Sequence, residues 1–298
     1  MYLSMNQSFR DTFGKKGYKI SLSAGMTCPN RDGTLGTRGC IFCSGAGEFA
    51  QKGTSVTQQI EEGAKRIEAK NKDGLYIAYF QDFTNTYAPL PRLRKLFYEA
   101  INHPRVAVLS VATRPDCLPR EVLELLEELN RIKPVWVELG LQTIHEATAS
   151  FLRRGYPLAV YDTAVVELHR RGITVITHLI LGLPGETAEM VYQTVSHVGN
   201  RTDGVKFHLL HIVKGTDLEP LYRQGLIATM SFPAYARLLG ECINRLPHHV
   251  VIHRLTGDGD KRTLLAPLWS GDKKHVLNSL GRFFAQENVR QGKLYLDK

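Results

Sequence analysis

Three of the five cysteines in this 298-residue chain lie in one short stretch, "CPNRDGTLGTRGCIFC", at positions Cys28, Cys40 and Cys43. Glycines and other turn-forming residues separate them, which predicts a loop. Thiolates bind zinc, copper(I) and iron–sulfur clusters. Structural zinc sites have four protein ligands, and iron–sulfur clusters usually have four cysteines. Three thiolates therefore leave one position open, on a zinc ion or on one iron of a cluster, unless these cysteines bind nothing.

The rest of the chain must position this loop, and its apolar pattern indicates how. Short apolar runs alternate with amphipathic segments. The expected strands are residues 18–23, 75–80, 106–113, 135–141, 174–183 and 204–212. The expected helices between them are residues 55–70, 90–102, 119–131, 159–172 and 187–199. Buried strands that alternate with helices predict a parallel sheet covered by helices, as in doubly wound sheets and α/β barrels.

The place of the cysteine loop in this pattern is informative. Cys28 directly follows the first expected strand, so the loop lies at the carboxyl end of the sheet, where ligand sites of both α/β architectures collect. Other unusual residues also follow strands: Gln81, Asp82, Thr113–Asp116, Gln142 and Gly182–Glu186. We expect these positions to share one edge of the sheet with the cysteines. After residue 212 the alternation changes to an expected helix, strand and helix at 232–246, 249–255 and 272–289.

The cysteine loop resembles that of the radical S-adenosylmethionine (radical SAM) superfamily, in which three cysteines hold a [4Fe–4S] cluster. The commonest superfamily spacing has a shorter first gap than the eleven residues between Cys28 and Cys40 here. The longer gap resembles one branch of the superfamily. Phe42, just before the last cysteine, matches the superfamily habit of an aromatic residue at this place.

Further segments narrow the resemblance. Four of them resemble, in order, the radical SAM domain of the Elongator catalytic subunit: "TRPDCL" (113–118), "VELGLQT" (137–143), "RRGY" (153–156) and "THLILGLPGE" (177–186). Two others are similar to signatures of a family of small bacterial radical SAM proteins: "QDFTNTYAP" (81–89) and "RLTGDGDKRTLLAPLW" (254–269). The superfamily resemblance covers roughly residues 15–215.

The resemblance implies a fold, cofactors and a reaction. The implied fold is α/β, a partial (β/α)6 TIM-like radical SAM barrel over residues 1–213 with a C-terminal α/β extension over 214–298. The implied cofactors are a [4Fe–4S] cluster on Cys28, Cys40 and Cys43, and S-adenosylmethionine (SAM) bound to its fourth iron. Reductive cleavage of SAM at the cluster would give a 5′-deoxyadenosyl radical that abstracts hydrogen from a substrate. An external electron donor such as flavodoxin or ferredoxin is implied as a partner.

Nine further residues are expected to bind the cofactors: Gln81, Thr113, Arg114, Glu138, Gln142, Arg154, His178, Gly182 and Gly185. Glu138 and Gln142 alternate along an expected strand, so both point to one face, into a barrel. A buried carboxylate needs a partner. That partner is the cofactor or, alternatively, Arg114 or Arg154 in an internal salt bridge. His178 is alternatively an ordinary core residue, and Gln81 is alternatively a polar cap at the end of a strand.

The charge of the chain bears on its substrate. The net charge of +9 favours a partner with phosphate groups, such as nucleic acid. The Elongator resemblance implies tRNA, with chemistry at C5 of a wobble uridine. Two alternatives stay open: a radical SAM enzyme on a small molecule such as a tetrapyrrole, and a non-enzymatic zinc or RNA-binding protein. The sequence lacks a run of about 18 apolar residues and an apolar signal-peptide core, so we expect a cytoplasmic protein without a membrane partner.

Overall fold

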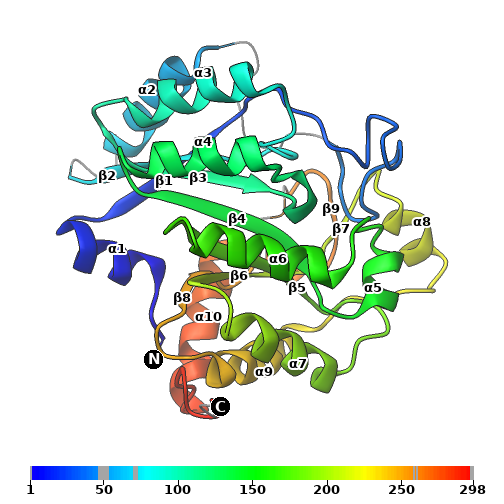
Figure 1. Cartoon of the computed structure of the whole chain (residues 1–298). Coiled ribbons are helices and arrows are strands. Elements are labelled where there is room, and N and C mark those ends of the chain that lie inside the picture. Colours follow the sequence, from blue (N-terminus) through cyan, green and yellow to red (C-terminus); the bar gives the residue numbers. More distant parts are fainter. Residues whose placement is uncertain (1, 46–53, 70–72, 258, 260, 296–298) are drawn as a thin grey trace.

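Among the residues that the structure describes, seven parallel strands form one curled sheet (Figure 1). The structure is a computed structural model and describes residues 2–45, 54–69, 73–257, 259 and 261–295. The strands of this sheet are β1 (Gly17–Leu22), β2 (Leu75–Phe80), β3 (Val106–Thr113), β4 (Val135–Gln142), β5 (Thr174–Leu181), β6 (Gly204–Leu209) and β8 (Val251–Arg254). They pair in the order β1-β2-β3-β4-β5-β6-β8, so β1 and β8 are the edges of an incomplete barrel. This confirms the expected partial α/β barrel.

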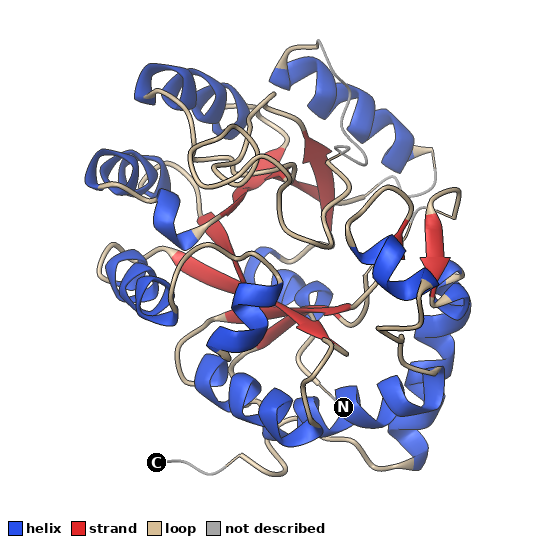
Figure 2. Cartoon of the chain, turned by 90° about the vertical axis from the view of Figure 1, so that its right-hand side faces the viewer, coloured by secondary structure: helices blue, strands red, loops and turns tan. Residues whose placement is uncertain are grey.

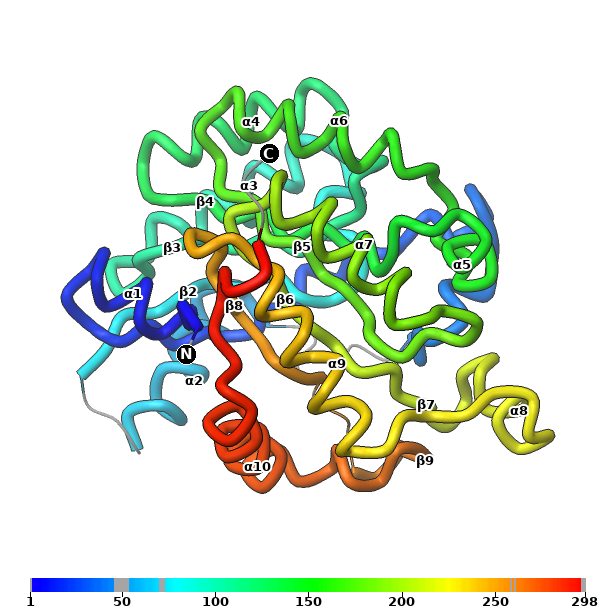
Figure 3. Tube along the Cα trace, turned by 90° about the horizontal axis from the view of Figure 1, so that it is seen from below, coloured from blue at the N-terminus to red at the C-terminus, as the bar shows by residue number. Residues whose placement is uncertain are grey.

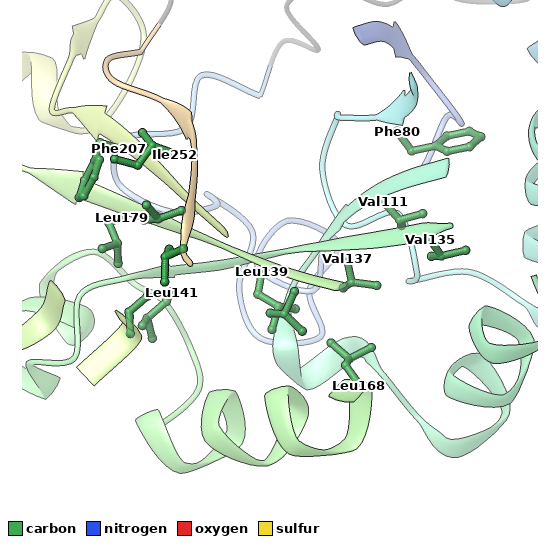
Figure 4. Packing of buried hydrophobic residues seen from close by; sticks show 14 of the residues in the cluster. Phe80, Val111, Val135, Val137, Leu139, Leu141, Leu168, Leu179, Phe207 and Ile252 are labelled. Carbon is green, nitrogen blue, oxygen red and sulfur yellow. The ribbon is translucent and has the colours of Figure 1, made fainter. Parts of the chain in front are cut away.

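The helices that follow β1 to β5 cover the outer face of the sheet (Figure 2). They are α2 (Val56–Glu68), α3 (Leu90–Ile101), α4 (Arg120–Asn130), α6 (Leu158–His169) and α7 (Ala188–Gly199). In α4, Val122 and Leu129 lie two turns apart on one buried face. On β4, Val137 and Leu139 point toward Leu168 of α6, and all three side chains are fully buried (Figure 4). Burying each such side chain stabilises the fold by about 1.5–3 kcal/mol.

An N-terminal helix that the sequence pattern did not predict closes the amino end of the barrel. This helix, α1 (Met5–Phe13), begins after Ser4, whose side chain caps it. Phe9 is 2% exposed and packs against residues near the starts of three strands, including Trp136, at a centroid distance of 6.2 Å. A Cβ on Gly17 would lie 2.7 Å from the Phe9 ring, so only glycine allows β1 to approach this closely. α1 contacts both edge strands, β1 and β8.

The segment after β6 returns to the sheet. It contains β7 (Ile212–Val213), α8 (Leu218–Arg223), α9 (Phe232–Arg245), β9 (Leu264–Ala266) and α10 (Lys273–Gln286), besides β8. α9 packs against α7 and α10 (Figure 3). β7 and β9 form a separate antiparallel pair. Because β8 pairs with β6 in parallel, this segment supplies the last strand of the main sheet. The division into domains at residue 213 stays a prediction.

The structure also contains short helices and strands outside the expected ones. The sequence pattern did not predict α5 (Glu146–Phe151), α8, β7, β9 or the 3₁₀ helices at Pro115–Cys117 and Leu268–Gly271. Residue 70 of the expected helix 55–70, and residues 258 and 260 of the segment 254–269, lie outside the described residues. Every helix in the described part of the chain is too short or too polar to span a bilayer.

Candidate functional site

A cavity of about 280 Å³ lies at the carboxyl end of the strands, and the three cysteines line it. Seven of the nine other predicted site residues also line it: Gln81, Thr113, Arg114, Glu138, Gln142, Arg154 and His178. Gly182 and Gly185 are not among the described residues of its wall. The parallel sheet therefore gathers at one edge side chains that are far apart in the sequence. We call this space the cysteine-lined cavity.

Hydrogen bonds shape the cysteine loop. The Cys43 N–H donates to the Cys40 carbonyl oxygen at 3.0 Å, so these two cysteines lie on one tight turn. Asn30 Nδ2 donates both to Cys40 Sγ (3.3 Å) and to the Arg153 carbonyl oxygen (2.6 Å). Arg31 Nη2 donates to the Cys43 carbonyl oxygen at 2.6 Å. The loop is therefore tied to the segment after α5 by the protein itself.

The thiols lie close enough to influence one another's ionisation. Burial raises the pKa of Cys40 to about 11, the hydrogen bond from Asn30 opposes this rise, and the Cys43 and Cys28 thiolates add to it. A metal centre that takes all three thiolates relieves this repulsion and releases protons. Among the described residues, no group of three His, Cys, Asp or Glu side chains is arranged to hold a single metal ion. Three cysteines that line one cavity are a ligand set that leaves one position open on a metal centre.

A buried charge network lies at the base of the cavity. Four donors surround the carboxylate of Glu138 on β4. They are Lys19 Nζ, Ser110 Oγ and His178 Nε2, each at 2.7 Å, and Lys206 Nζ. Burial by itself raises the pKa of Glu138, but the two lysine charges outweigh it and hold this pKa well below its usual range. The internal partners are thus lysines rather than the two arginines considered from the sequence, and a contact of Glu138 with the cofactor stays a prediction. We call these five residues the Glu138 network.

His178 has a defined protonation state in this network. Because a carboxylate only accepts, Nε2 of the neutral ring carries the proton that it donates to Glu138 Oε2. Burial lowers the pKa of His178 to about 4, and the Lys206 charge adds to the effect. The ring is therefore neutral at pH 7, with Nδ1 as an acceptor. The ring of His208, which also lines the cavity, lies 5.3 Å from it between centroids.

The two predicted arginines already have protein partners. Arg114 forms a bidentate pair with Asp116, with Nε–Oδ1 at 2.9 Å and Nη2–Oδ2 at 2.7 Å. Arg154 is 3% exposed and donates to the carbonyl oxygens of Tyr156 (2.9 Å) and Thr143 (2.6 Å). Both guanidinium groups contact the Tyr156 ring, at 5.2 Å and 4.9 Å from its centroid. The arginines therefore hold this wall of the cavity in shape, and their contact with the cofactor stays a prediction.

Gln81, Thr113 and Gln142 stand at the ends of β2, β3 and β4. Ser21 Oγ donates to Gln81 Oε1 at 2.9 Å, which fixes the orientation of that amide. Thr113 Oγ1 lies 2.5 Å from Thr86 Oγ1. Gln142 has a φ of 71°, a left-handed conformation that non-glycine residues rarely adopt. Backbone strain of this kind clusters at functional sites, which agrees with the role predicted for Gln142.

The glycine loop after β5 lies beside the cavity rather than in its wall. Gly182 and Gly185 both have a φ of 81°, a left-handed conformation that favours glycine. A Cβ on Gly182 would lie 2.9 Å from Met230 Sδ, so this glycine also permits the close approach of Met230. The structure thus gives Gly182 and Gly185 a conformational reason to be glycine. Their contact with the cofactor stays a prediction.

Several polar residues of this region were not among the predicted ones, including Tyr79, Lys206, His208 and Arg254. Lys206 Nζ donates to the hydroxyl of Tyr79 at 3.1 Å and, as described, to Glu138. Lys206 and His208 alternate along the apolar run "GVKFHL" of β6. This is the same pattern that singled out Glu138 and Gln142 on β4, so the sequence carried a signal for these two. Tyr79 lies in the apolar strand β2, and Arg254 ends the short strand β8. Neither strand has an alternation of polar residues that would single these two out.

Comparisons with known proteins identify close and distant relatives. The family model described as "Radical SAM superfamily" matches residues 33–198, and the model described as "Radical_SAM C-terminal domain" matches residues 202–284. The chain is 40% identical over 298 residues to "Uncharacterized protein YtqA" of Bacillus subtilis, covering 99% of this chain and 92% of that protein. It is 37% identical over 282 residues to "Protein YhcC" of Escherichia coli, covering 93% of this chain and 90% of that protein.

More distant similarities are partial. The "tRNA uridine(34) acetyltransferase" of Methanocaldococcus jannaschii is 29% identical over 126 residues, which are 41% of this chain and 23% of that protein. The solved structure of archaeal Methanocaldococcus infernus Elp3 shares the fold over 92% of this chain, with a TM-score of 0.71 and 16% identity. This chain spans 64% of that structure. Because the superfamily description covers more than half of the chain, this protein belongs to the radical SAM superfamily, whose cofactors are a [4Fe–4S] cluster and SAM.

Proposed function

We propose that this protein is a radical SAM enzyme that modifies tRNA at C5 of a wobble uridine. The observation that carries the proposal is the cysteine-lined cavity, in which three thiols share a wall with polar residues from the strand ends. The partial similarity to a protein named tRNA uridine(34) acetyltransferase supports an RNA substrate. The net charge of +9 also supports it, because a basic surface releases counterions when it binds phosphates.

The residues of the chain bind, orient and shield the reactants. When bound, the cluster and SAM would supply radical chemistry that removes hydrogen from the substrate. The thiolates of Cys28, Cys40 and Cys43 would hold the cluster, and the same cavity would hold SAM beside it. Nδ1 of neutral His178 accepts a hydrogen bond from an amino or hydroxyl group in the cavity, while Glu138 keeps the ring in place. An external donor such as flavodoxin or ferredoxin delivers the electron.

Cluster assembly and SAM cleavage test the first half of the proposal. The protein is reconstituted anaerobically with iron and sulfide, mixed with dithionite and SAM, and assayed for 5′-deoxyadenosine by chromatography. Wild type should form it, and Cys40→Ala should not, because one cluster ligand is missing. Cys242→Ala is the matched control, since Cys242 is fully buried in α9 and does not line the cavity. A chain that binds zinc but assembles no cluster contradicts the proposal.

Turnover on RNA tests the second half. Total tRNA from a strain that lacks the gene is added to the same reaction, and its nucleosides are analysed by mass spectrometry. We expect tRNA to raise the yield of 5′-deoxyadenosine and a wobble uridine to change mass. If 5′-deoxyadenosine forms but tRNA changes neither its yield nor any nucleoside, the tRNA proposal is wrong.

A further inference from the structure

The glycine loop after β5, residues 182–186, is held at both ends by other parts of the chain. At its far end, Thr143 Oγ1 donates to Glu186 Oε1 at 2.5 Å, which ties the loop to the end of β4. At its near end, Gly182 faces Met230, because a Cβ on this glycine would lie 2.9 Å from Met230 Sδ and 3.0 Å from its Cγ. The loop is therefore fixed between the carboxyl edge of the sheet and the C-terminal segment.

Met230 is itself held by aromatic side chains. Trp269 Nε1 donates to the Met230 carbonyl oxygen at 3.0 Å. The Trp269 ring packs on those of Phe232 and Tyr235, at centroid distances of 5.3 and 5.7 Å. Tyr235 is fully buried, and its hydroxyl donates to the Leu255 carbonyl oxygen at 2.6 Å. We call Phe232, Tyr235 and Trp269 the Trp269 cluster. Its contacts fix the backbone of Met230 beside the glycine loop.

These supporting residues come from the part of the chain that follows β6. Met230 lies just before α9, and Trp269 lies in the 3₁₀ helix Leu268–Gly271. Both fall within residues 202–284, which the C-terminal family model matches. α9 also packs along α7, the helix that follows the glycine loop. The C-terminal segment thus contacts both the loop and the helix to which the loop leads.

Support matters here because the loop has a costly conformation. Gly182 and Gly185 are both left-handed, and glycine loses more conformational freedom on folding than any other residue. A loop without support has to be ordered when its ligand binds, and the cost of this ordering weakens binding. Contacts that order the loop beforehand remove that cost.

We propose that Met230 is a positioning residue for SAM binding. Its side chain holds the glycine loop in the conformation that binds SAM, and the Trp269 cluster holds Met230. The inference rests on the proposed function and on the predicted contact of Gly182 and Gly185 with SAM. Met230 is not among the described residues that line the cysteine-lined cavity, so it acts through the loop rather than by contact with SAM. The C-terminal segment thereby takes part in cofactor binding.

Truncation of Met230 tests the inference. The cluster is reconstituted anaerobically in each variant, and the dissociation constant of SAM is measured by equilibrium dialysis. Met230→Ala should bind SAM about 3–10-fold more weakly, which is the cost of ordering one flexible group on binding. Met230→Leu should bind as wild type does, because it nearly keeps the side-chain volume. Met190→Ala is the matched control, since Met190 is also half-buried but is not among the residues that a Cβ on Gly182 would meet.

A double-mutant cycle isolates the contact between Gly182 and Met230. Gly182→Ala adds a Cβ that displaces the Met230 side chain, and it also strains the backbone, because φ is 81° at this position. The backbone strain is present with and without the Met230 side chain, so it cancels in the cycle. We expect Gly182→Ala to weaken SAM binding by a factor about 3-fold larger in wild type than in Met230→Ala.

Further measurements separate a positioning role from a folding defect. Iron content and thermal unfolding show whether each variant is loaded and folded. The electron paramagnetic resonance spectrum of the reduced cluster without SAM should be the same in Met230→Ala and wild type. The change that SAM causes in this spectrum should require more SAM in the variant. Trp269→Phe removes the donor to the Met230 carbonyl oxygen but keeps an aromatic ring, so it should show a smaller loss of SAM affinity in the same direction.

The outcomes separate this inference from the proposed function. If Gly182→Ala weakens SAM binding but Met230→Ala does not, or if the two losses are additive, the loop binds SAM without help from Met230 and the inference is wrong. If both variants bind SAM as wild type does, the inference is also wrong, while the proposed function stands. If the cluster-loaded wild type does not bind SAM, the proposed function fails and this inference fails with it.

Discussion

Replacing Glu138 by Gln tests whether the Glu138 network holds the interior of the barrel together. The substitution keeps the shape of the side chain but removes the negative charge that faces Lys19 and Lys206. The lysine side chains are 19% and 2% exposed, and that of Glu138 is fully buried, so water cannot replace the lost partner. Removing one partner of a buried ion pair costs about 3–5 kcal/mol. We therefore expect Glu138→Gln to lower the free energy of unfolding by about 3–5 kcal/mol at pH 7.

The loss should depend on pH in a defined direction. Because the folded-state pKa of Glu138 lies well below the ordinary value of 4.5, the carboxylate stabilises the fold fully above that ordinary value. This stability is lost as the pH falls through the folded-state pKa. The difference between wild type and Glu138→Gln should be constant near neutral pH and shrink in the acid range. Urea unfolding of the metal-free, reduced protein, followed by circular dichroism at several pH values, measures it.

An exposed ion pair of similar length provides the control. Arg94 and Glu128 are 2.8 Å apart, but their side chains are 46% and 43% exposed. Glu128→Gln should have little effect, because water and salt screen exposed pairs. A further variant, Glu138→Gln with Lys206→Met, should recover part of the loss, since it no longer buries a lysine without its partner. If Glu138→Gln is as stable as Glu128→Gln at pH 7, the reasoning about the Glu138 network is refuted.

Two further predictions concern the ends of the barrel. Phe9→Ala should lower the free energy of unfolding by about 3–5 kcal/mol, because it leaves a cavity beside Trp136. Urea unfolding measures this, and a loss below about 1 kcal/mol would show that α1 does not close the core. Asn30→Asp should weaken iron retention about 10–100-fold, because it replaces a donor to Cys40 Sγ by a negative charge. Competition with a chelator measures it, and retention equal to that of wild type would show that the loop does not need this hydrogen bond.

The sequence was sufficient for the main elements of the fold, because each carries its own period. The buried runs of β2 to β5 and the two-turn repeats of α4 are local signals, and the structure has all of these elements. What the sequence did not reveal depends on contacts between distant residues. Helix α1 has a short apolar face of Met5, Phe9 and Phe13 at four-residue spacing, but only Phe9 is buried, and its partners lie on distant strands. Both β6 and β8 were expected as strands, but their pairing was not, because strand pairing leaves no local mark in the sequence.

The candidate site followed the same division. Cys28, Cys40 and Cys43 were recognisable from spacing, and strand-end position brought most other predicted residues into the same cavity. The partners of these residues were harder to foresee. Glu138 is paired with lysines of β1 and β6, which lie on strands far from it in sequence. Physical proximity across a curled sheet decides such pairs, and a sequence pattern does not contain it.

The junction between the two ends of the chain bears on how the protein is made. The Leu3 N–H donates to Gln291 Oε1 at 2.8 Å, across a separation of 288 residues, and the Leu3 carbonyl oxygen accepts from the Ile252 N–H at 2.8 Å. At about 5–20 residues per second, a ribosome needs about 15–60 s to add that many residues. Leu3 therefore has to wait for these two hydrogen bonds until residues 252 and 291 have been synthesised. The contact between Leu3 and β8 can therefore form only after residue 252 has been synthesised, whereas Phe9 can pack earlier on Ile77, Val108 and Trp136.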